Sequence, residues 1–192
     1  MKKKTIIVIA IACIALICGG FYFMLSSGSG NQEKPLTEAE TLIAKDLVNH
    51  YPNTPREVIK LYNRIMMCYY DEDTTKEQLE DLADQMLMLL DEELLLVNDR
   101  EAYHAAVFAE VARYKEKNKV IVEADVCDTN EVNNFTDKDK DDKIAEVIVS
   151  YLVREGSNVY RDNQEHVLRM DANGKWKLVV SRQIEGENSD DE

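Results

Sequence analysis

The sequence predicts an α+β protein in which an N-terminal transmembrane helix precedes several helices packed on one face of an antiparallel sheet. Three observations lead to this fold class. An apolar run follows three lysines at the N-terminus, helix caps and apolar residues at three-and-four spacing fill residues 37–117, and alternating apolar residues fill residues 120–184. Helices followed by a run of strands are typical of α+β domains with the helices on one side of the sheet.

The apolar run from Thr5 to Leu25 is uncharged and follows lysines at positions 2–4. A helix of this length spans about 30 Å, the thickness of the hydrocarbon core of a bilayer. Because basic residues stay cytoplasmic, we expect a single-pass protein of the cell membrane with a cytoplasmic N-terminus and an extracellular C-terminal domain. A cleaved signal peptide is the alternative, but its apolar core is usually about 7–15 residues, so an uncleaved anchor is favoured.

The composition restricts the partners of the part outside the membrane. The chain has 192 residues, with 23 Lys and Arg against 37 Asp and Glu, for a net charge of −14. Nucleic acids and anionic lipid surfaces both require a basic face, so no nucleic-acid partner is expected. The expected partners are the bilayer, through Thr5 to Leu25, and either another envelope protein or a second copy of the chain.

Four segments follow from these patterns. Residues 1–25 are the lysine cluster and anchor, and residues 26–36 are a flexible linker of the Gly/Ser type. Residues 37–184 form the extracytoplasmic domain. Residues 185–192 are an acidic tail, which we expect to be disordered.

The first half of the domain carries clear helix starts. Thr37 with Glu40 and Thr54 with Glu57 form capping boxes, and a third helix begins at Thr74 or Thr75. The first helix is expected to place Leu42, Ile43, Leu47 and Val48 on one stripe. The second carries Val58, Leu61, Tyr62, Ile65, Met66 and Tyr69 on one face.

A long apolar stretch then continues past the third helix. We expect a break near Asp91 with a buried turn, because Leu94–Val97 would make a surface helix apolar on too many sides. A fourth helix should begin after Asn98 or Asp99 and run to about residue 117. Its expected inward residues are Ala106, Val107, Val111 and Tyr114.

The apolar period changes to two at residue 120. Residues 120–126 predict a strand with one buried face, residues 128–142 a mobile polar loop, and residues 144–154 a central strand. Residues 159–170 and 175–184 should form a hairpin around Asn173-Gly174. The faces predicted to be buried are Val120, Val122, Ala124 and Val126 in the first strand and Trp176, Leu178, Val180 and Ile184 in the last.

The closing hairpin, in which a turn at Asp171 is followed by Gly-Lys-Trp-Lys-Leu, carries a family resemblance. With the order of helices and long strands, it resembles the nuclear-transport-factor-two-like (SnoaL-like) superfamily over residues 54–184. This resemblance implies a curved, cone-like sheet wrapped on helices. The layout is also similar to uncharacterised membrane-anchored envelope proteins of Gram-positive bacteria. The superfamily includes pocket enzymes, binding modules and dimerisation domains, so it does not select an activity.

Metal, cofactor and nucleophile motifs are missing from the sequence. His50, His104 and His166 are scattered without a second ligand at metal spacing, and no Cys-x-x-Cys pair or phosphate-binding glycine loop occurs. We therefore predict no metal, no cofactor and no catalytic residue. The sequence leaves a disulfide between Cys68 and Cys127 as an alternative, although the helical spacing of Cys68 favours a buried thiol.

Three residues are candidates for lining a ligand pocket. His166 shares its strand face with Leu168 and Met170 and would look into a cone-shaped cavity, where Tyr62 or Tyr151 could pair with it. We expect a membrane-tethered, extracytoplasmic, non-catalytic binding or assembly domain. The alternative is a small pocket enzyme with isomerase-like or dehydratase-like acid/base chemistry on the same residues.

Overall fold

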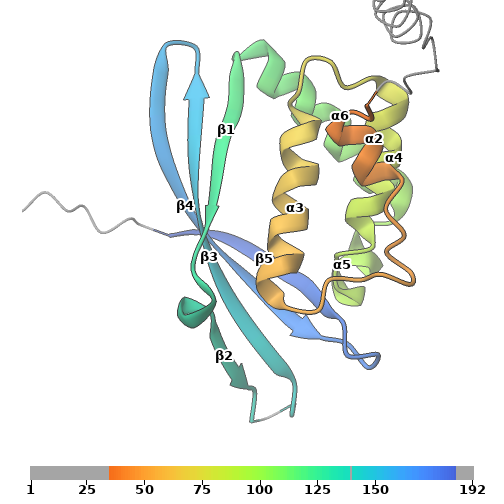
Figure 1. Ribbon diagram of the computed structural model, residues 1–192, viewed down its shortest axis with the longest axis vertical. Helices are drawn as coiled ribbons and strands as arrows, with labels where there is room; N and C mark the ends of the chain where they lie inside the picture. Colours follow the sequence, from red (N-terminus) through yellow and green to blue (C-terminus); the bar gives the residue numbers. More distant parts are fainter. Residues whose placement is uncertain (1–34, 139, 185–192) are drawn as a thin grey trace, which may run out of the picture. The chain divides into compact units, whose positions relative to one another are not determined.

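The computed structural model describes residues 35–138 and 140–184, which contain five helices and a five-stranded antiparallel sheet (Figure 1). The predicted α+β class is confirmed. The predicted anchor from Thr5 to Leu25, nearly all of the linker and the acidic tail lie outside the described residues. Within the described ranges, every helix is too short or too polar to cross a membrane.

The helices begin where the caps predict. α3, α4 and α6 are the long ones, and capping boxes at Thr37, Thr54 and Thr75 start α2, α3 and α4. Asp91 caps α5 and Asp99 caps α6 through their side chains, so the predicted break at Asp91 is confirmed. The bounds are Glu38–Ile43 for α2, Pro55–Tyr69 for α3, Lys76–Leu87 for α4, Glu92–Val97 for α5 and Arg100–Glu116 for α6.

Three details of the helical half differ from the prediction. α2 ends at Ile43 because the Asp46 carboxylate accepts the backbone N–H groups of residues 48 and 49 and forms a turn, which leaves Val48 exposed. α5 is not buried, since it lies at the surface with Leu96 and Val97 exposed. Ala106 is also exposed, whereas Val107 and Val111 face the core as expected.

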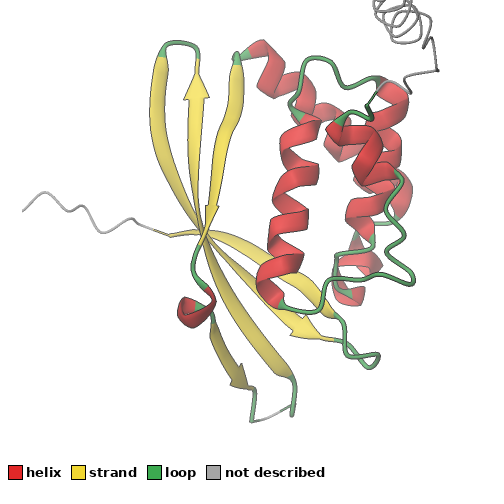
Figure 2. Cartoon of the chain, in the orientation of Figure 1, coloured by secondary structure: helices red, strands yellow, loops and turns green. Residues whose placement is uncertain are grey.

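The strands form one sheet with β3 at its centre (Figure 2). β3 pairs with β1 and β2 along one edge and with β4 along the other, and β5 follows β4. The predicted central strand over residues 144–154 is therefore confirmed. The bounds are Lys119–Val126 for β1, Asn133–Thr136 for β2, Lys143–Glu155 for β3, Asn158–Met170 for β4 and Trp176–Ile184 for β5.

Register shifts in the two flanking strands correct the predicted faces. The pairing of β1 with β3 shifts between Ile121 and Glu123, and Val122 is exposed rather than buried. The pairing of β5 with β4 shifts between Leu178 and Val180, so Val180 is also exposed. A bulge adds one residue to one strand, and every later side chain changes face, which a strict period of two cannot anticipate.

Residues 128–142 are not the featureless loop that their polar composition suggested. Thr129–Glu131 form a short 3₁₀ helix, and β2 pairs with the first residues of β3. The pairing is made by backbone groups, so it does not depend on apolar side chains. Phe135 is the large apolar residue of β2, and it lies partly exposed opposite Ile144.

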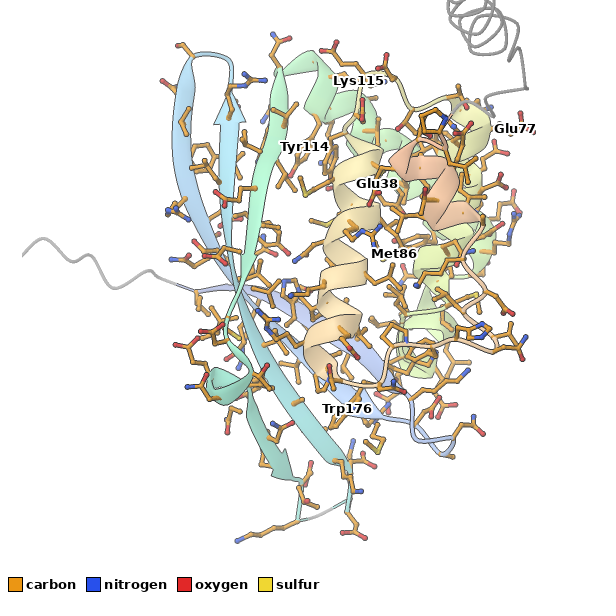
Figure 3. All side chains as sticks on the ribbon, viewed as in Figure 1. Glu38, Glu77, Met86, Tyr114, Lys115 and Trp176 are labelled. Atoms are coloured by element: carbon orange, nitrogen blue, oxygen red, sulfur yellow. The ribbon has the colours of Figure 1, made fainter. Side chains whose placement is uncertain are left out.

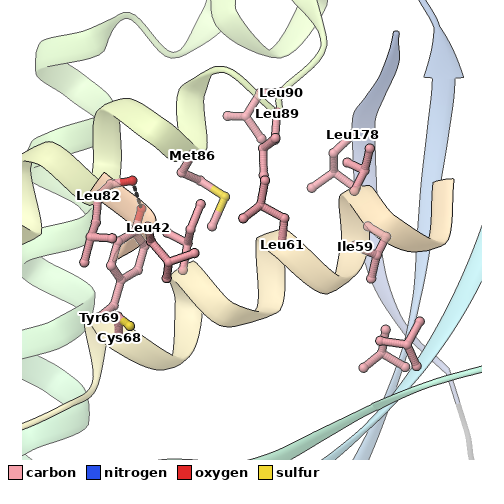
Figure 4. Packing of buried hydrophobic residues seen from close by; sticks show 14 of the residues in the cluster. Leu42, Ile59, Leu61, Cys68, Tyr69, Leu82, Met86, Leu89, Leu90 and Leu178 are labelled. Atoms are coloured by element: carbon pink, nitrogen blue, oxygen red, sulfur yellow. Dashed lines mark hydrogen bonds between the residues drawn. The ribbon is translucent and has the colours of Figure 1, made fainter. Parts of the chain in front are cut away.

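The core lies between the sheet and the helices, with α3 at its centre (Figure 4). α3 contacts β1, β3 and β5 on one side and α2 and α4 on the other. Leu61 of α3 lies toward Leu89, and Ile59 of the same helix is fully buried. Trp176 is buried at the start of β5, as predicted (Figure 3). Cys68 and Cys127 are both free thiols, and Cys68 is buried.

Candidate functional site

The structure brings the three predicted pocket residues together on the helix-facing side of the sheet. Tyr62 comes from α3, Tyr151 from β3 and His166 from β4. The Tyr151 hydroxyl lies 2.9 Å from Nε2 of His166, and the rings of Tyr62 and His166 are 5.4 Å apart between centroids. The predicted set is thus one spatial cluster, although Tyr151 and His166 are buried and only Tyr62 keeps partial exposure.

Two further residues extend this cluster into a hydrogen-bonded chain. The Tyr151 hydroxyl donates to Oδ1 of Asn63 over 2.6 Å, so it accepts from His166, whose Nε2 must carry the proton. Nδ1 of His166 then accepts from the Ser181 hydroxyl over 2.7 Å. We call these four residues, Asn63, Tyr151, His166 and Ser181, the buried polar chain. It links α3, β3, β4 and β5. Its first three members are buried, and Ser181 is the exposed outer end.

Sequence reasoning missed the two ends of the buried polar chain, for different reasons. Asn63 follows the buried Ile59 by four residues, so a polar residue on an inward helical position was the available signal. A strict period of two from Trp176 puts Ser181 on the outer face, but the register shift before Val180 places it opposite His166. Nδ2 of Asn63 is buried and has no hydrogen-bond partner among the described residues.

The buried polar chain is neutral at physiological pH. Burial lowers the pKa of His166 to about 4, and burial raises the pKa of Tyr151 and of Tyr62 well above the ordinary range of a phenol. Both ring nitrogens of His166 already hold hydrogen bonds within the chain. The cluster therefore has the character of a neutral hydrogen-bonded network, running from the core to the exposed Ser181, rather than of a charged acid/base pair.

His166 should give the protein a measurable acid sensitivity. Its folded-state pKa, about 4 against an ordinary 6.5, means that the unfolded chain takes up the proton first as the pH falls. The contribution of neutral His166 to the free energy of unfolding is nearly complete above about pH 6.5 and is lost as the pH falls toward 4. Between pH 6.5 and 5 we expect urea unfolding to show a loss of about 2 kcal/mol in the free energy of unfolding.

The matched variants for this prediction are His166→Gln and His50→Gln. Glutamine offers a donor and an acceptor but does not titrate, so most of the loss over this pH range should disappear in His166→Gln. His50 is exposed, and its replacement should leave the pH dependence unchanged. The same slope in both variants would show that His166 is not the titrating group.

A separate cavity opens at the surface beside the β4–β5 hairpin. Its volume is about 510 Å³, and we call it the hairpin cavity. It lies between the α4–α5 segment and the hairpin, and its lining joins residues more than 40 positions apart in the sequence. Leucine and methionine side chains form its apolar part and charged side chains its two ends. None of Tyr62, Tyr151 and His166 lines it.

One end of the hairpin cavity is acidic and is organised by Arg169. The Arg169 guanidinium donates to both carboxylate oxygens of Asp91, over 2.5 and 3.1 Å, and to Glu93 over 2.9 Å. Asp142 lies 3.5 Å from the same guanidinium. Asp91, and to a lesser extent Glu93, raise the pKa of Arg169 above its already high ordinary value. Three carboxylates thus share one positive charge, and the lining holds two more, Glu92 and Asp171.

The other end is basic and is organised by Tyr51. The ammonium groups of Lys175 and Lys177 lie 5.0 and 4.6 Å from the centre of the Tyr51 ring. Each donates to a backbone carbonyl, Lys175 to Val48 and Lys177 to Met88, and neither forms an ion pair with a carboxylate of the described residues. Burial lowers the pKa of Lys177, although the nearby Asp171 carboxylate opposes this shift.

Metal chemistry finds no support in the described part of the chain. No three His, Cys, Asp or Glu side chains of residues 35–138 and 140–184 are grouped to hold a metal ion. Burial raises the pKa of the Cys68 thiol to about 11, so Cys68 is protonated at neutral pH and unsuited to nucleophilic work.

Comparisons with known proteins give a family but no activity. Residues 1–180 match the family described as Domain of unknown function (DUF6715). No match was found among curated proteins. Among solved structures, the transfer protein TraH from the Gram-positive conjugative plasmid pIP501 aligns with a TM-score of 0.38 and 11% identity, over 71% of this chain and 98% of that one. A likeness this weak carries no argument about fold or function.

Proposed function

We propose that this chain, which belongs to the DUF6715 family, is a membrane-tethered extracytoplasmic binding domain whose ligand or partner occupies the hairpin cavity. The observation that carries the proposal is the cavity itself. It is open to solvent, it combines an apolar lining with charged groups at both ends, and its volume of about 510 Å³ falls in the usual range for ligand sites. Assembly with another envelope protein, or with a second copy, is binding of the same kind.

The alternative of an acid/base enzyme has less support. Its candidate residues belong to the buried polar chain, where His166 has no accessible surface and is neutral. A general base must reach the proton that it abstracts from a substrate. Both nitrogens of His166 instead bond to Tyr151 and Ser181. The geometry therefore favours a role for this cluster in holding α3 on the sheet.

Occupancy of the hairpin cavity can be tested without knowing the occupant. Met88 and Met170 line the cavity and oxidise readily, so hydroxyl-radical footprinting with mass spectrometry reports on both. We expect both to be oxidised more slowly in intact cells stripped of their wall than in the purified full chain. Tyr160 is exposed on β4 and lines neither end of the cavity, so its oxidation rate should not change. Equal rates at Met88 and Met170 in the two samples would reject the proposal.

The membrane location and the orientation of the chain are proposed from the N-terminal sequence pattern alone. Lysines at positions 2–4 before the apolar run from Thr5 to Leu25 place the N-terminus inside and residues 37–184 outside. Protease added to intact wall-free cells should therefore degrade the C-terminal domain and leave a cytoplasmic control protein whole. Survival of residues 145–184 until the membrane is permeabilised would show the opposite orientation.

The nuclear-transport-factor-two-like resemblance remains a proposal about the shape of the fold. Its support is the order of helices and strands, the bend of β3 and β4, and the position of α3 against the helix-facing side of the sheet (Figure 1). The proteins named in the comparisons above include no member of that superfamily.

A further inference from the structure

The two charged ends of the hairpin cavity are held at a fixed spacing by the sheet. Arg169 of β4 and Lys177 of β5 are directly opposite in the register. Cross-strand neighbours have their Cβ atoms about 5 Å apart. From this pair the side chains extend to different partners, Arg169 to the carboxylates on α5 and Lys177 to Tyr51 and the Met88 carbonyl. The paired strands thus anchor one residue of the acidic end and one of the basic end in the lining of one cavity.

Neither end is neutral on its own. At the acidic end, Asp91, Glu93 and Asp142 surround one guanidinium, which leaves an excess of negative charge. Asp91 is buried, so the excess is presented to the cavity by Glu93 and Asp142. At the basic end, two ammonium groups converge on one ring and donate to backbone carbonyls, and the single nearby carboxylate, Asp171, leaves an excess of positive charge. A cation is favoured at the first end and an anion at the second.

We infer that the hairpin cavity binds a zwitterionic small molecule, an amino acid or a short peptide, with its ammonium group at Glu93 and Asp142 and its carboxylate at Lys175 and Lys177. This inference rests on the proposed function and adds the class of ligand to it. Leucine and methionine side chains between the two ends would cover the apolar part of the ligand, namely Leu47, Leu87, Met88, Leu90, Leu95 and Met170.

Ligands with charge of one sign fit less well. A dianion would meet the lysines at one end and be repelled by Glu93 and Asp142 at the other, and a dication would be repelled by Lys175 and Lys177. A neutral ligand would leave the excess charge at each end uncompensated. The arrangement therefore selects against each alternative by repulsion as well as by missing contacts.

Three five-carbon probes test the inference, because they differ only in their terminal charges. They are 5-aminopentanoate, glutarate and 1,5-diaminopentane. Each is titrated into the dialysed full chain in detergent micelles, and binding is followed by saturation-transfer difference NMR. We expect 5-aminopentanoate to bind and the other two to bind at least about tenfold more weakly, which is the effect of losing one charge-assisted hydrogen bond.

Variants locate the binding. Lys175→Gln and Glu93→Gln, at the basic and acidic ends of the cavity, should each weaken the binding of 5-aminopentanoate by about tenfold. Lys117→Gln, which replaces an exposed lysine outside the cavity lining, should have no effect. Thermal melting of each variant confirms that it is folded. Equal binding of all three probes, no binding of any, or insensitivity to both cavity variants would overturn the inference. Protection of Met88 and Met170 in cells would still stand in that case, and it would assign the cavity to an occupant of different chemistry.

Discussion

Replacing Trp176 with alanine is expected to lower the free energy of unfolding by about 3–5 kcal/mol. Trp176 is 8% exposed, and it is the single tryptophan of the chain. Its side chain belongs to the hydrophobic core at the start of β5, so truncation to alanine leaves a cavity there. The Tyr51 hydroxyl donates to the backbone carbonyl of Trp176, a bond that alanine keeps, so the loss reports on the indole alone.

Val180→Ala is the matched control in the same strand. Val180 is 44% exposed, because the register shift after Leu178 turns it away from the core, and its truncation should cost less than about 1 kcal/mol. Tryptophan emission gives a second readout, blue-shifted in the folded protein and moving red on unfolding. A Trp176→Ala variant as stable as the parent, with parent emission near that of tryptophan in water, would place the indole at the surface.

How far the sequence could predict this fold is shown by the difference between its helices and its strands. Helix starts depend on neighbouring residues, so Thr54, Pro55 and Glu57 were sufficient to place the beginning of α3. The burial of individual strand residues depends on pairing with residues far along the chain. The bulges that expose Val122 and Val180 leave no mark in local composition, and three of the four paired residues of β2 are polar.

The candidate site also has residues that the local sequence predicts and residues that depend on long-range pairing. Tyr62, Tyr151 and His166 could be grouped because each lies on a face whose period is visible in the sequence. Asn63 and Ser181 complete their hydrogen bonds, and Ser181 could not be assigned because the β5 bulge reverses its face. The hairpin cavity was not predicted at all. Its charged residues read as an ordinary solvated surface until the fold brings α5 and the β4–β5 hairpin together.

Removing the guanidinium at the acidic end of the hairpin cavity should be as costly as removing the indole. Arg169→Met is expected to lower the free energy of unfolding by about 3–5 kcal/mol, because it leaves the Asp91 carboxylate buried without its counter-charge. The side chain of Asp91 is 3% exposed, and both of its oxygens accept from Arg169. Methionine keeps most of the length and apolar volume of the arginine stem, so packing is changed little.

Glu93→Gln is the control within the same network. The side chain of Glu93 is 58% exposed, and its bond to Arg169 is screened by water, so we expect a change of about 0–1 kcal/mol. The two variants therefore separate a buried ion pair from an exposed one that shares the same guanidinium. Both are measured by urea unfolding at neutral pH.

The double variant Arg169→Met with Asp91→Asn decides whether the cost arises from the uncompensated charge. Asparagine keeps a side-chain oxygen for the cap of α5, where Asp91 accepts from the Glu93 backbone N–H over 3.0 Å. If the buried charge is the cause, the double variant should recover more than half of the stability lost in Arg169→Met, a coupling of about 2 kcal/mol. Additive losses would instead show that Arg169 acts through the packing of its stem, and the charge asymmetry of the hairpin cavity would then contribute little to the stability of the folded chain.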